Sequence, residues 1–492
     1  MRPPRSLRLR PRRLRLPRSG KSIGALAVVF VALVSSVTFA GDGKKGSSTD
    51  TDKARGRVRG AQPNGSKPLF DLLKETDDIA IRVSKLRGLP ILKPIARGLM
   101  SREAITQRIL ARLDEEYSPS ELLGEEQTYK RLGLLPVDED YKRLIIDLLT
   151  SQLAGFYDPK AKELYLADWI GDSDDAGGGL DGMLAGLMQR VVVAHEIDHA
   201  LQDQSFDLIK YMQSSKDNSD QQLARQAVVE GDGTVLMMEF LQMEMGIGEP
   251  LSWSNPAILD SFREPVIAQM MSGDLAKVPL FIRESMLFPY LAGLGLVASL
   301  RTRHPWSEVD KLFREPPLST EQVIHPQKYL AAEKPVSVRP ATIAALNRWR
   351  TVYRNVVGEF GWGKLLLQHG LSKERADQAA AGWGGDCLVA YAPANHAGVA
   401  DLVVVSQSVW DAEGEAVEAF EATAEMLAKL TGDDQCVGPA APSVLLMCSD
   451  STKDVSFVER KGNRLVLVIG AAGEETATTL RAQLWAGWKA SR

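Results

Sequence analysis

Residues 191–206, VVVAHEIDHALQDQSF, place two histidines four positions apart in a segment that is otherwise rich in apolar residues. On an α-helix, residues i and i+4 lie on one face about 6 Å apart along the axis, so His195 and His199 can present their imidazoles to one ion. The alternative is a solvated, charged turn of helix. Because the apolar neighbours indicate that this helix packs against a core, two unpaired imidazoles and a carboxylate there would be costly. The segment therefore predicts a buried helix that carries a metal site.

The third metal ligand that we expect is Glu230, in the later helical segment RQAVVEGDGTVLMMEF. Catalytic zinc sites usually have three protein ligands and leave one position for water. Gly231 and Gly233 follow this glutamate, and each glycine inside a helix costs about 1 kcal/mol. Close packing against the motif helix would explain the glycines and bring Glu230 to the ion. In the alternative interpretation, the glycines end a helix and Glu230 faces solvent.

The remaining roles are assigned to residues near these ligands. Glu196 lies one step round the helix from His195, where it is poorly placed to be a ligand but well placed to act as the general base on a water at the metal. Asp203, four residues after His199, is predicted to orient a ligand imidazole or to be polar surface. Asp232 is a second candidate for such an orienting role.

Peptide hydrolysis also requires a donor for the negative charge that develops on the carbonyl oxygen. Two residues are the first donors to test: His325, in STEQVIHPQKY, and Tyr290, in LFPYLAG. A histidine before proline is more often an ordinary loop residue, which is the alternative for His325.

Several segments resemble a known class of enzymes. HEIDHALQDQ with the later EGDG resembles the gluzincin branch of zinc metallopeptidases, in which a helical glutamate completes the zinc site. More narrowly, the chain is similar to poorly characterised exported bacterial proteins with HExxHALQDQ and EGDAT blocks. AGFYDP, FPYLAG, PPLSTEQVIHP and GWGGD are similar to further blocks of that group, and the resemblance extends from about residue 71 to the end. Gly233 departs from it, because the group usually has alanine there.

The N-terminus has the pattern of an export segment. Residues 1–22 are basic and contain no acid, and residues 23–40, IGALAVVFVALVSSVTFA, are uncharged. This pattern predicts a signal peptide or an N-terminal membrane anchor over residues 1–40, and therefore a periplasmic, cell-envelope or secreted protein. A basic tail before a buried helix is the alternative. Residues 41–67 lack apolar periodicity and are predicted to be a disordered linker.

The rest of the chain divides into two predicted domains, and the predicted fold class is α+β. Residues 68–372 form a mainly helical, zincin-like metallopeptidase domain, helical over 68–149 and with a small β-hairpin at 155–167. By analogy of order with zincins, this hairpin is the sheet edge that pairs with an extended substrate. Residues 373–492 contain several apolar strands and two helices, and they predict a small α+β module with an antiparallel sheet.

The three cysteines are Cys387, Cys436 and Cys448. None forms a CxxC pair, which argues against a cysteine-bound zinc. In an exported protein Cys436 and Cys448 could pair across a short loop and leave Cys387 free, or all three could be buried small hydrophobic residues. The sequence does not decide between these interpretations.

The function expected from these features is that of an exported zinc (Zn²⁺) metallopeptidase, with peptide or protein substrates. The ordinary composition, with 25% charged residues and a net charge of −4, argues against nucleic acid as the main partner. One alternative is a non-catalytic binding or structural module with a zinc that only joins helices, which predicts a closed site of four protein ligands. The other is a zinc hydrolase of a different substrate class.

Overall fold

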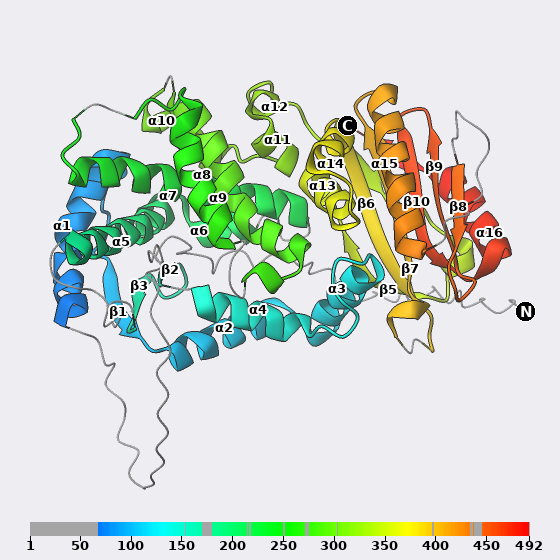
Figure 1. The fold of residues 1–492 in the computed structure, drawn as a ribbon, viewed down its shortest axis with the longest axis horizontal. Helices are drawn as coiled ribbons and strands as arrows, with labels where there is room; N and C mark the ends of the chain where they lie inside the picture. The colour runs from blue at the N-terminus through cyan, green and yellow to red at the C-terminus, as the bar shows by residue number, and fades with distance from the viewer. Residues whose placement is uncertain are drawn as a thin grey trace, which may run out of the picture.

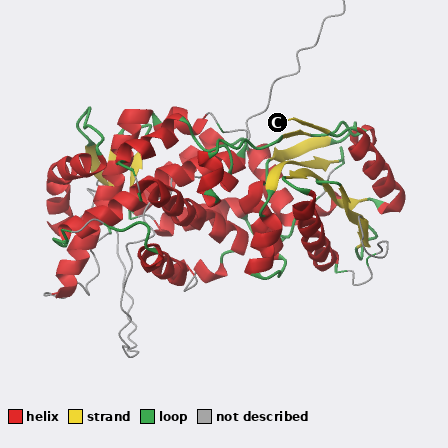
Figure 2. Cartoon of the chain, turned by 90° about the horizontal axis from the view of Figure 1, so that it is seen from above, coloured by secondary structure: helices red, strands yellow, loops and turns green. Residues whose placement is uncertain are grey.

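The computed structural model describes residues 67–491, apart from 153, 170–179, 214, 216–217, 249–250, 271–274, 303, 396–397, 433–435 and 437–444. The predicted export segment and all but the last residue of the predicted linker lie outside the described residues. The described chain is elongated, with a mainly helical part at one end and a six-stranded antiparallel sheet with its helices at the other (Figures 1 and 2). The predicted α+β fold class is confirmed.

The helical part is built around helix α7 (Ser219–Glu244), which packs against several other helices. Its helices are α1 (Lys67–Arg87), α2 (Arg102–Glu116), α3 (Pro119–Arg131), α4 (Tyr141–Gln152), α5 (Leu180–Phe206), α6 (Leu208–Gln213), α7 (Ser219–Glu244), α8 (Pro256–Met270), α9 (Leu280–Arg301), α10 (Trp306–Arg314), α11 (Thr320–Ile324) and α12 (Pro326–Leu330). Helix α7 packs against both α5 and α9, and α1 packs on α5. The side chain of Asn218 caps α7 by accepting a hydrogen bond from the amide of Gln221.

Among the described residues, α9 is the helix long and apolar enough to cross a membrane. The same composition is typical of a helix in the core of a large domain. Helix α9 lies along α7, and its residues Leu294, Leu296 and Val297 are fully buried in the core that α5, α7 and α1 share. We therefore describe α9 as a core helix of this part.

A three-stranded sheet lies beside α5. Strands β2 (Gly155–Asp158) and β3 (Glu163–Ala167) form the predicted antiparallel hairpin, with Gly155 opposite Leu166. Strand β1 (Ala96–Met100) adds to β3 in parallel, which gives the order β1-β3-β2 and leaves β2 at an edge. The wholly helical pattern predicted for residues 68–149 is wrong at β1, because this strand exists only through pairing with a distant segment.

The second sheet has the order β5-β6-β7-β10-β9-β8, and all its neighbours are antiparallel. Its edge strand β5 (Arg350–Asn355) precedes the domain boundary predicted at residue 373. The other elements are α13 (Gly358–Gln368), α14 (Lys373–Ala380), β6 (Trp383–Ala392), β7 (Val403–Trp410), α15 (Glu413–Thr431), β8 (Leu445–Ser449), β9 (Val455–Lys461), β10 (Arg464–Ala471) and α16 (Gly473–Ala486). A separate pair joins β4 (Ser337–Arg339) to β11 (Lys489–Ser491).

Both faces of this sheet are covered, and strand β10 shows how. Successive residues of a strand point to opposite faces. Leu465 and Leu467 belong to the core that contains residues of α15, whereas Val466 and Val468 belong to the core that contains residues of α16. The continuous apolar run of β10 is therefore explained by burial on both sides.

The structure contains a disulfide between Cys436 and Cys448, while Cys387 is a buried free thiol. This settles the alternative left open by the sequence.

The two cysteines are 12 residues apart. Replacing both by serine should lower the free energy of unfolding by about 3 kcal/mol, because the open loop gains entropy in the unfolded chain. Urea titration measures this change. A Cys387→Ala variant, which keeps the disulfide, is the control, and equal stability of the double variant and the parent would contradict the prediction.

Candidate metal centre

The three predicted ligands meet where α5 and α7 pack together. His195 Nε2 and His199 Nε2 are 3.0 Å apart, and Glu230 Oε2 lies 3.4 Å from the first and 3.5 Å from the second. Ligand atoms about 2.0–2.2 Å from one tetrahedral zinc would be separated by roughly 3.3–3.5 Å. We refer to these three residues as the triad. The two separations to Glu230 match this range, and the two imidazole nitrogens lie about 0.3 Å closer together than it.

The chemistry of the triad also fits a cation. All three side chains are buried. The separations between the carboxylate oxygen and the imidazole nitrogens exceed the usual 2.7–3.2 Å of a hydrogen bond. Glu230 Oε2 is buried and has no hydrogen-bond partner among the described residues, and the two imidazole nitrogens, 3.0 Å apart, face each other beside it. Such an arrangement is costly unless a positive charge joins the three groups. The residues present therefore fit a bound metal.

Local electrostatics follow from burial and from the charge on Glu230. Burial lowers the pKa of His195, and the neighbouring His199 adds to that effect. Burial also opposes charge on His199, but the Glu230 carboxylate outweighs it and raises the pKa of His199 to about 10. Against its own burial, His199 holds the pKa of Glu230 below its usual value. Glu230 is thus an anion beside both imidazoles, as a metal ligand should be.

Glu196 lies beside the triad but is not one of its converging ligands. One carboxylate oxygen, Oε2, accepts a hydrogen bond of 2.8 Å from the backbone amide of Tyr157 on β2. The other oxygen, Oε1, is buried and has no hydrogen-bond partner among the described residues. Burial raises the pKa of Glu196 to about 8, although His199 partly opposes the shift. The hairpin thus positions a carboxyl group that exchanges a proton near neutral pH.

The two predicted oxyanion donors lie in different surroundings. Tyr290, on α9, hydrogen-bonds to Glu230, and burial followed by the charges of Glu230 and Glu196 raises its pKa well above 10. Its hydroxyl therefore keeps its proton beside the triad. His325, between α11 and α12, instead pairs with Glu359 of α13 at 2.8 Å. This hydrogen bond directs the His325 ring to Glu359 and not to the triad, so its role as a donor stays a prediction.

Asp203 lies on α5 but does not contact a ligand imidazole in its recorded hydrogen bonds. Its carboxylate accepts bonds from the Tyr157 hydroxyl at 2.7 Å and from Lys162 Nζ at 2.7 Å. Asp203 therefore joins the motif helix to the β2–β3 hairpin. It holds the strand whose amide bonds Glu196, rather than orienting a histidine directly.

The residue that orients His199 is Gln202, which the sequence analysis did not single out. Its side-chain amide donates to Asp198 Oδ2 at 2.8 Å, so Gln202 Oε1 is directed to His199 Nδ1 at 3.0 Å. With a metal bound in place of the second proton, the imidazole would carry its proton on Nδ1 and offer the lone pair of Nε2 to the metal. The signal was present in the sequence, because Gln202 follows His199 by three residues on the same helix face.

A Gln202→Leu variant should bind a divalent metal ion about 10- to 100-fold more weakly, because the tautomer and ring orientation of His199 are no longer held. Competition with a fluorescent chelator measures the affinity. Gln204→Leu is a matched control on the same helix, since Gln204 bonds the backbone of Leu92 and Lys93 rather than an imidazole. If both variants lose affinity equally, the effect comes from the helix and not from His199.

Asp232 takes part in a buried ionic cluster below the triad. Arg87, the last residue of α1, forms two hydrogen bonds of 2.8 Å with Asp232, and its Nη1 lies 2.8 Å from Asp310. Its guanidinium also stacks over Trp306 at 4.5 Å. Burial raises the pKa of Asp198 to about 8, with a further contribution from Asp232. Asp232 therefore does not hydrogen-bond a ligand imidazole; it pairs with Arg87 and acts electrostatically on Asp198 and His199.

The two glycines after Glu230 allow close approach on two sides of α7. A Cβ at Gly233 would lie 2.7 Å from His195 Cε1, so glycine makes room for the ligand ring. A Cβ at Gly231 would lie 2.3 Å from the carbonyl carbon of Gly293 on α9. Close packing against α5, the helix with the two histidines, explains Gly233, as expected. Close packing against α9 explains Gly231.

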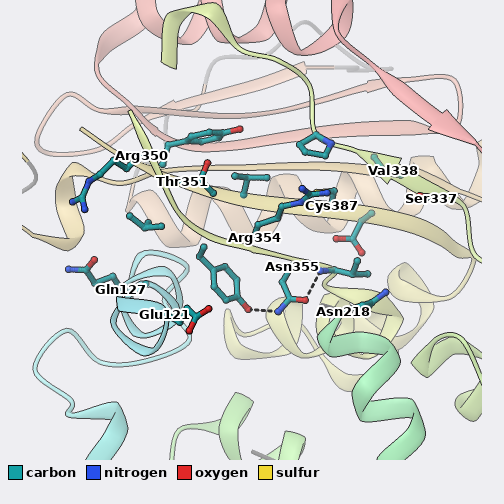
Figure 3. A pocket seen from close by; sticks show the side chains of 18 of the residues that line it. Glu121, Gln127, Asn218, Ser337, Val338, Arg350, Thr351, Arg354, Asn355 and Cys387 are labelled. Carbon is teal, nitrogen blue, oxygen red and sulfur yellow. Dashed lines mark hydrogen bonds between the residues drawn. The ribbon is translucent and has the colours of Figure 1, made fainter. Parts of the chain in front are cut away.

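A cavity of about 1130 Å³ lies away from the triad, between α3 and strands β4, β5 and β6 (Figure 3). Arg354, on β5, lies within it near Cys387, and Arg350 lies toward one side. Both arginines are exposed, and the cavity contains none of the triad. Volume alone therefore does not identify the functional site.

Comparison with known protein families gives a match outside the triad. A family model described as a domain of unknown function (DUF8575) matches residues 347–481. These residues run from just before β5 into α16, so they cover the six-stranded sheet and not the triad. No curated protein and no solved structure matches the chain. The function of the triad therefore has to be inferred from its geometry.

Proposed function

We propose that this protein is a zinc-dependent peptidase of the gluzincin type that acts outside the cytoplasm. The observation that carries the proposal is the convergence of two imidazole nitrogens and one carboxylate oxygen beside Glu196, a carboxylate that is not one of them. A zinc that only joins helices is expected to have four protein ligands. Three converge here among the described residues, which favours a site with room for water.

When bound, zinc would polarise a water molecule and a substrate carbonyl. Glu196 would accept the proton of that water and later release it to the leaving amine, a role that its position beside the triad allows. Tyr290, whose hydroxyl stays protonated, would donate to the oxygen on which negative charge develops.

The surroundings of the triad support a peptide as the substrate. Strand β2 is one of the two edge strands of its sheet, and it lies beside Glu196, to which its Tyr157 amide donates. An extended peptide can add to such an edge through main-chain hydrogen bonds. The basic and apolar N-terminal segments and the Cys436–Cys448 disulfide support a location outside the cytoplasm.

The test combines metal analysis of the full-length protein with digestion of a broad peptide library. The parent should contain about one zinc per chain and cleave peptides. Variants His195→Ala and Glu230→Ala should contain much less zinc and cleave nothing, since both remove a ligand. Zinc in the parent without any peptide cleavage would overturn the proposal in favour of a structural zinc. Hydrolysis of other substrates alone would favour a zinc hydrolase of another class.

A further inference from the structure

A second cavity, of about 180 Å³, lies between α3, α4, α7, α9 and α13. Its walls are mostly aromatic and aliphatic, and they include Tyr117, Tyr129, Tyr141, Phe281, Met286 and Phe360. A water molecule takes up about 30 Å³, so the cavity has room for several waters or for one long side chain. A mostly apolar lining with a few polar groups is typical of ligand sites.

Two buried carboxyl groups line this apolar cavity. Tyr129 donates a hydrogen bond of 2.7 Å to Glu125 Oε1, while Glu125 Oε2 has no hydrogen-bond partner among the described residues. Asp220 accepts hydrogen bonds from the amide and the hydroxyl of Thr320. Within the described part of the chain, neither carboxyl group is ion-paired with a lysine, arginine or histidine. Burial raises the pKa of Glu125 to about 7 and that of Asp220 to about 8.

The aromatic rings add a second attraction for positive charge. The Tyr129 ring lies 5.7 Å from that of Tyr141 and 5.3 Å from that of Phe281, measured between centroids. Aromatic faces attract ammonium and guanidinium groups, and the attraction grows when water is excluded. A purely apolar occupant would leave the Glu125 oxygen unpaired, which is costly in a buried site. Carboxyl groups with aromatic walls instead suit a cation on an apolar stem.

The cavity lies close to the triad along two helices. Gln226, in its lining, is four residues before Glu230 on α7, and Met286 is four residues before Tyr290 on α9. Residues four apart share a helix face and are separated by about 6 Å along the axis. Asp220 lies at the other end of the cavity, ten residues before Glu230 on α7 and thus about 15 Å away along the axis. Only a long side chain of a residue held at the triad would extend toward the two carboxyl groups.

We propose that this cavity is a specificity pocket for the basic side chain, lysine or arginine, of a peptide substrate. The inference rests on the proposed peptidase function. The ammonium or guanidinium group would pair with Glu125, with Asp220 as the second carboxyl group, and the aliphatic stem would lie against the aromatic walls. A free organic amine has the same chemistry, so the experiment separates the two sources.

Matched peptides that differ only in one residue next to the cleaved bond test the pocket. The parent should show kcat/KM at least about 10-fold higher for lysine or arginine than for norleucine, the value of a charged hydrogen bond. Glu125→Gln should lower kcat/KM for the lysine peptide at least about 10-fold more than for the norleucine peptide. Glu126→Gln is the control, because Glu126 is the next residue on α3 and pairs with Lys130. It should leave both values unchanged.

Calorimetry with n-butylammonium separates failure of the pocket from failure of the peptidase function. The parent should bind n-butylammonium and not n-butanol, and Glu125→Gln should abolish the binding. If this pattern holds but no peptide is cleaved, the cation site stands and its assignment to a peptide substrate falls. If n-butylammonium does not bind, or if lysine and norleucine peptides are cleaved equally, the proposal is overturned. Asp220→Asn repeats the test should Glu125→Gln not fold.

Discussion

Replacing Glu196 by glutamine should lower kcat for peptide hydrolysis at least ~100-fold, the usual scale for the loss of a general base. The substitution keeps the size of the side chain and the hydrogen bond from the Tyr157 amide, but it removes the group that accepts a proton. Because Glu196 is not one of the converging ligands, the variant should keep the zinc content of the parent. Steady-state kinetics, metal analysis and thermal unfolding on the same preparation check these expectations.

The comparison with His195→Ala makes this result specific. His195 is a ligand, so its alanine variant should lose zinc and activity together, whereas Glu196→Gln should lose activity alone. Hydrolysis by Glu196→Gln at the parental rate would show that another group is the base. Loss of zinc from this variant would show that Glu196 helps to hold the metal.

Replacing Arg87 by methionine should lower the free energy of unfolding by about 3–5 kcal/mol, because it leaves buried carboxylates without their cation. The guanidinium is fully buried and pairs with Asp232 and Asp310. Zinc affinity should fall as well, because Asp198, which is stabilised by Arg87, holds the Gln202 amide that orients His199. Chemical denaturation and chelator competition measure the two effects.

The exposed pair of Arg97 with Asp77 provides the matched control for this variant. Its aspartate side chain is 71% exposed, so Arg97→Met should cost less than about 1 kcal/mol. Removing Asp232 together with Arg87 should recover part of the lost stability, since fewer buried charges remain unpaired. Equal losses for Arg87→Met and Arg97→Met would mean that burial of the cluster contributes nothing.

The parts of the fold and of the candidate site that sequence reasoning predicted depend on local periodicity. The pairing of His195 with His199 follows from helix geometry, and the hairpin follows from a change of period around a short turn. Strand β1, the parallel partner of β3, could not be predicted from local sequence. Residues 96–100 form a strand only because the later segment β3 pairs with them. The same holds for β5, which belongs to a sheet whose other strands come later.

The residues that surround the three ligands were harder to predict from the sequence than the ligands themselves. Gln202 carries a local signal, since it is three residues from His199 on one helix. Arg87 carries none, because it reaches Asp232 across a separation of 145 residues and is the last residue of its helix. A charged residue at a helix end is usually solvated. Only the tertiary fold makes this one the cation beneath the site.

The contact between Gly231 and Gly293 has a consequence for motion in the molecule. Backbone meets backbone there without side chains between them, so α7 and α9 cannot approach further at this point, and the two helices pack extensively along their length. Glu230 and Tyr290 lie one and three residues from this contact, and they therefore travel together as one rigid body. Any opening that admits a substrate must come from the other walls, α5 or the β2–β3 hairpin, while the ligand and its tyrosine keep their mutual distance.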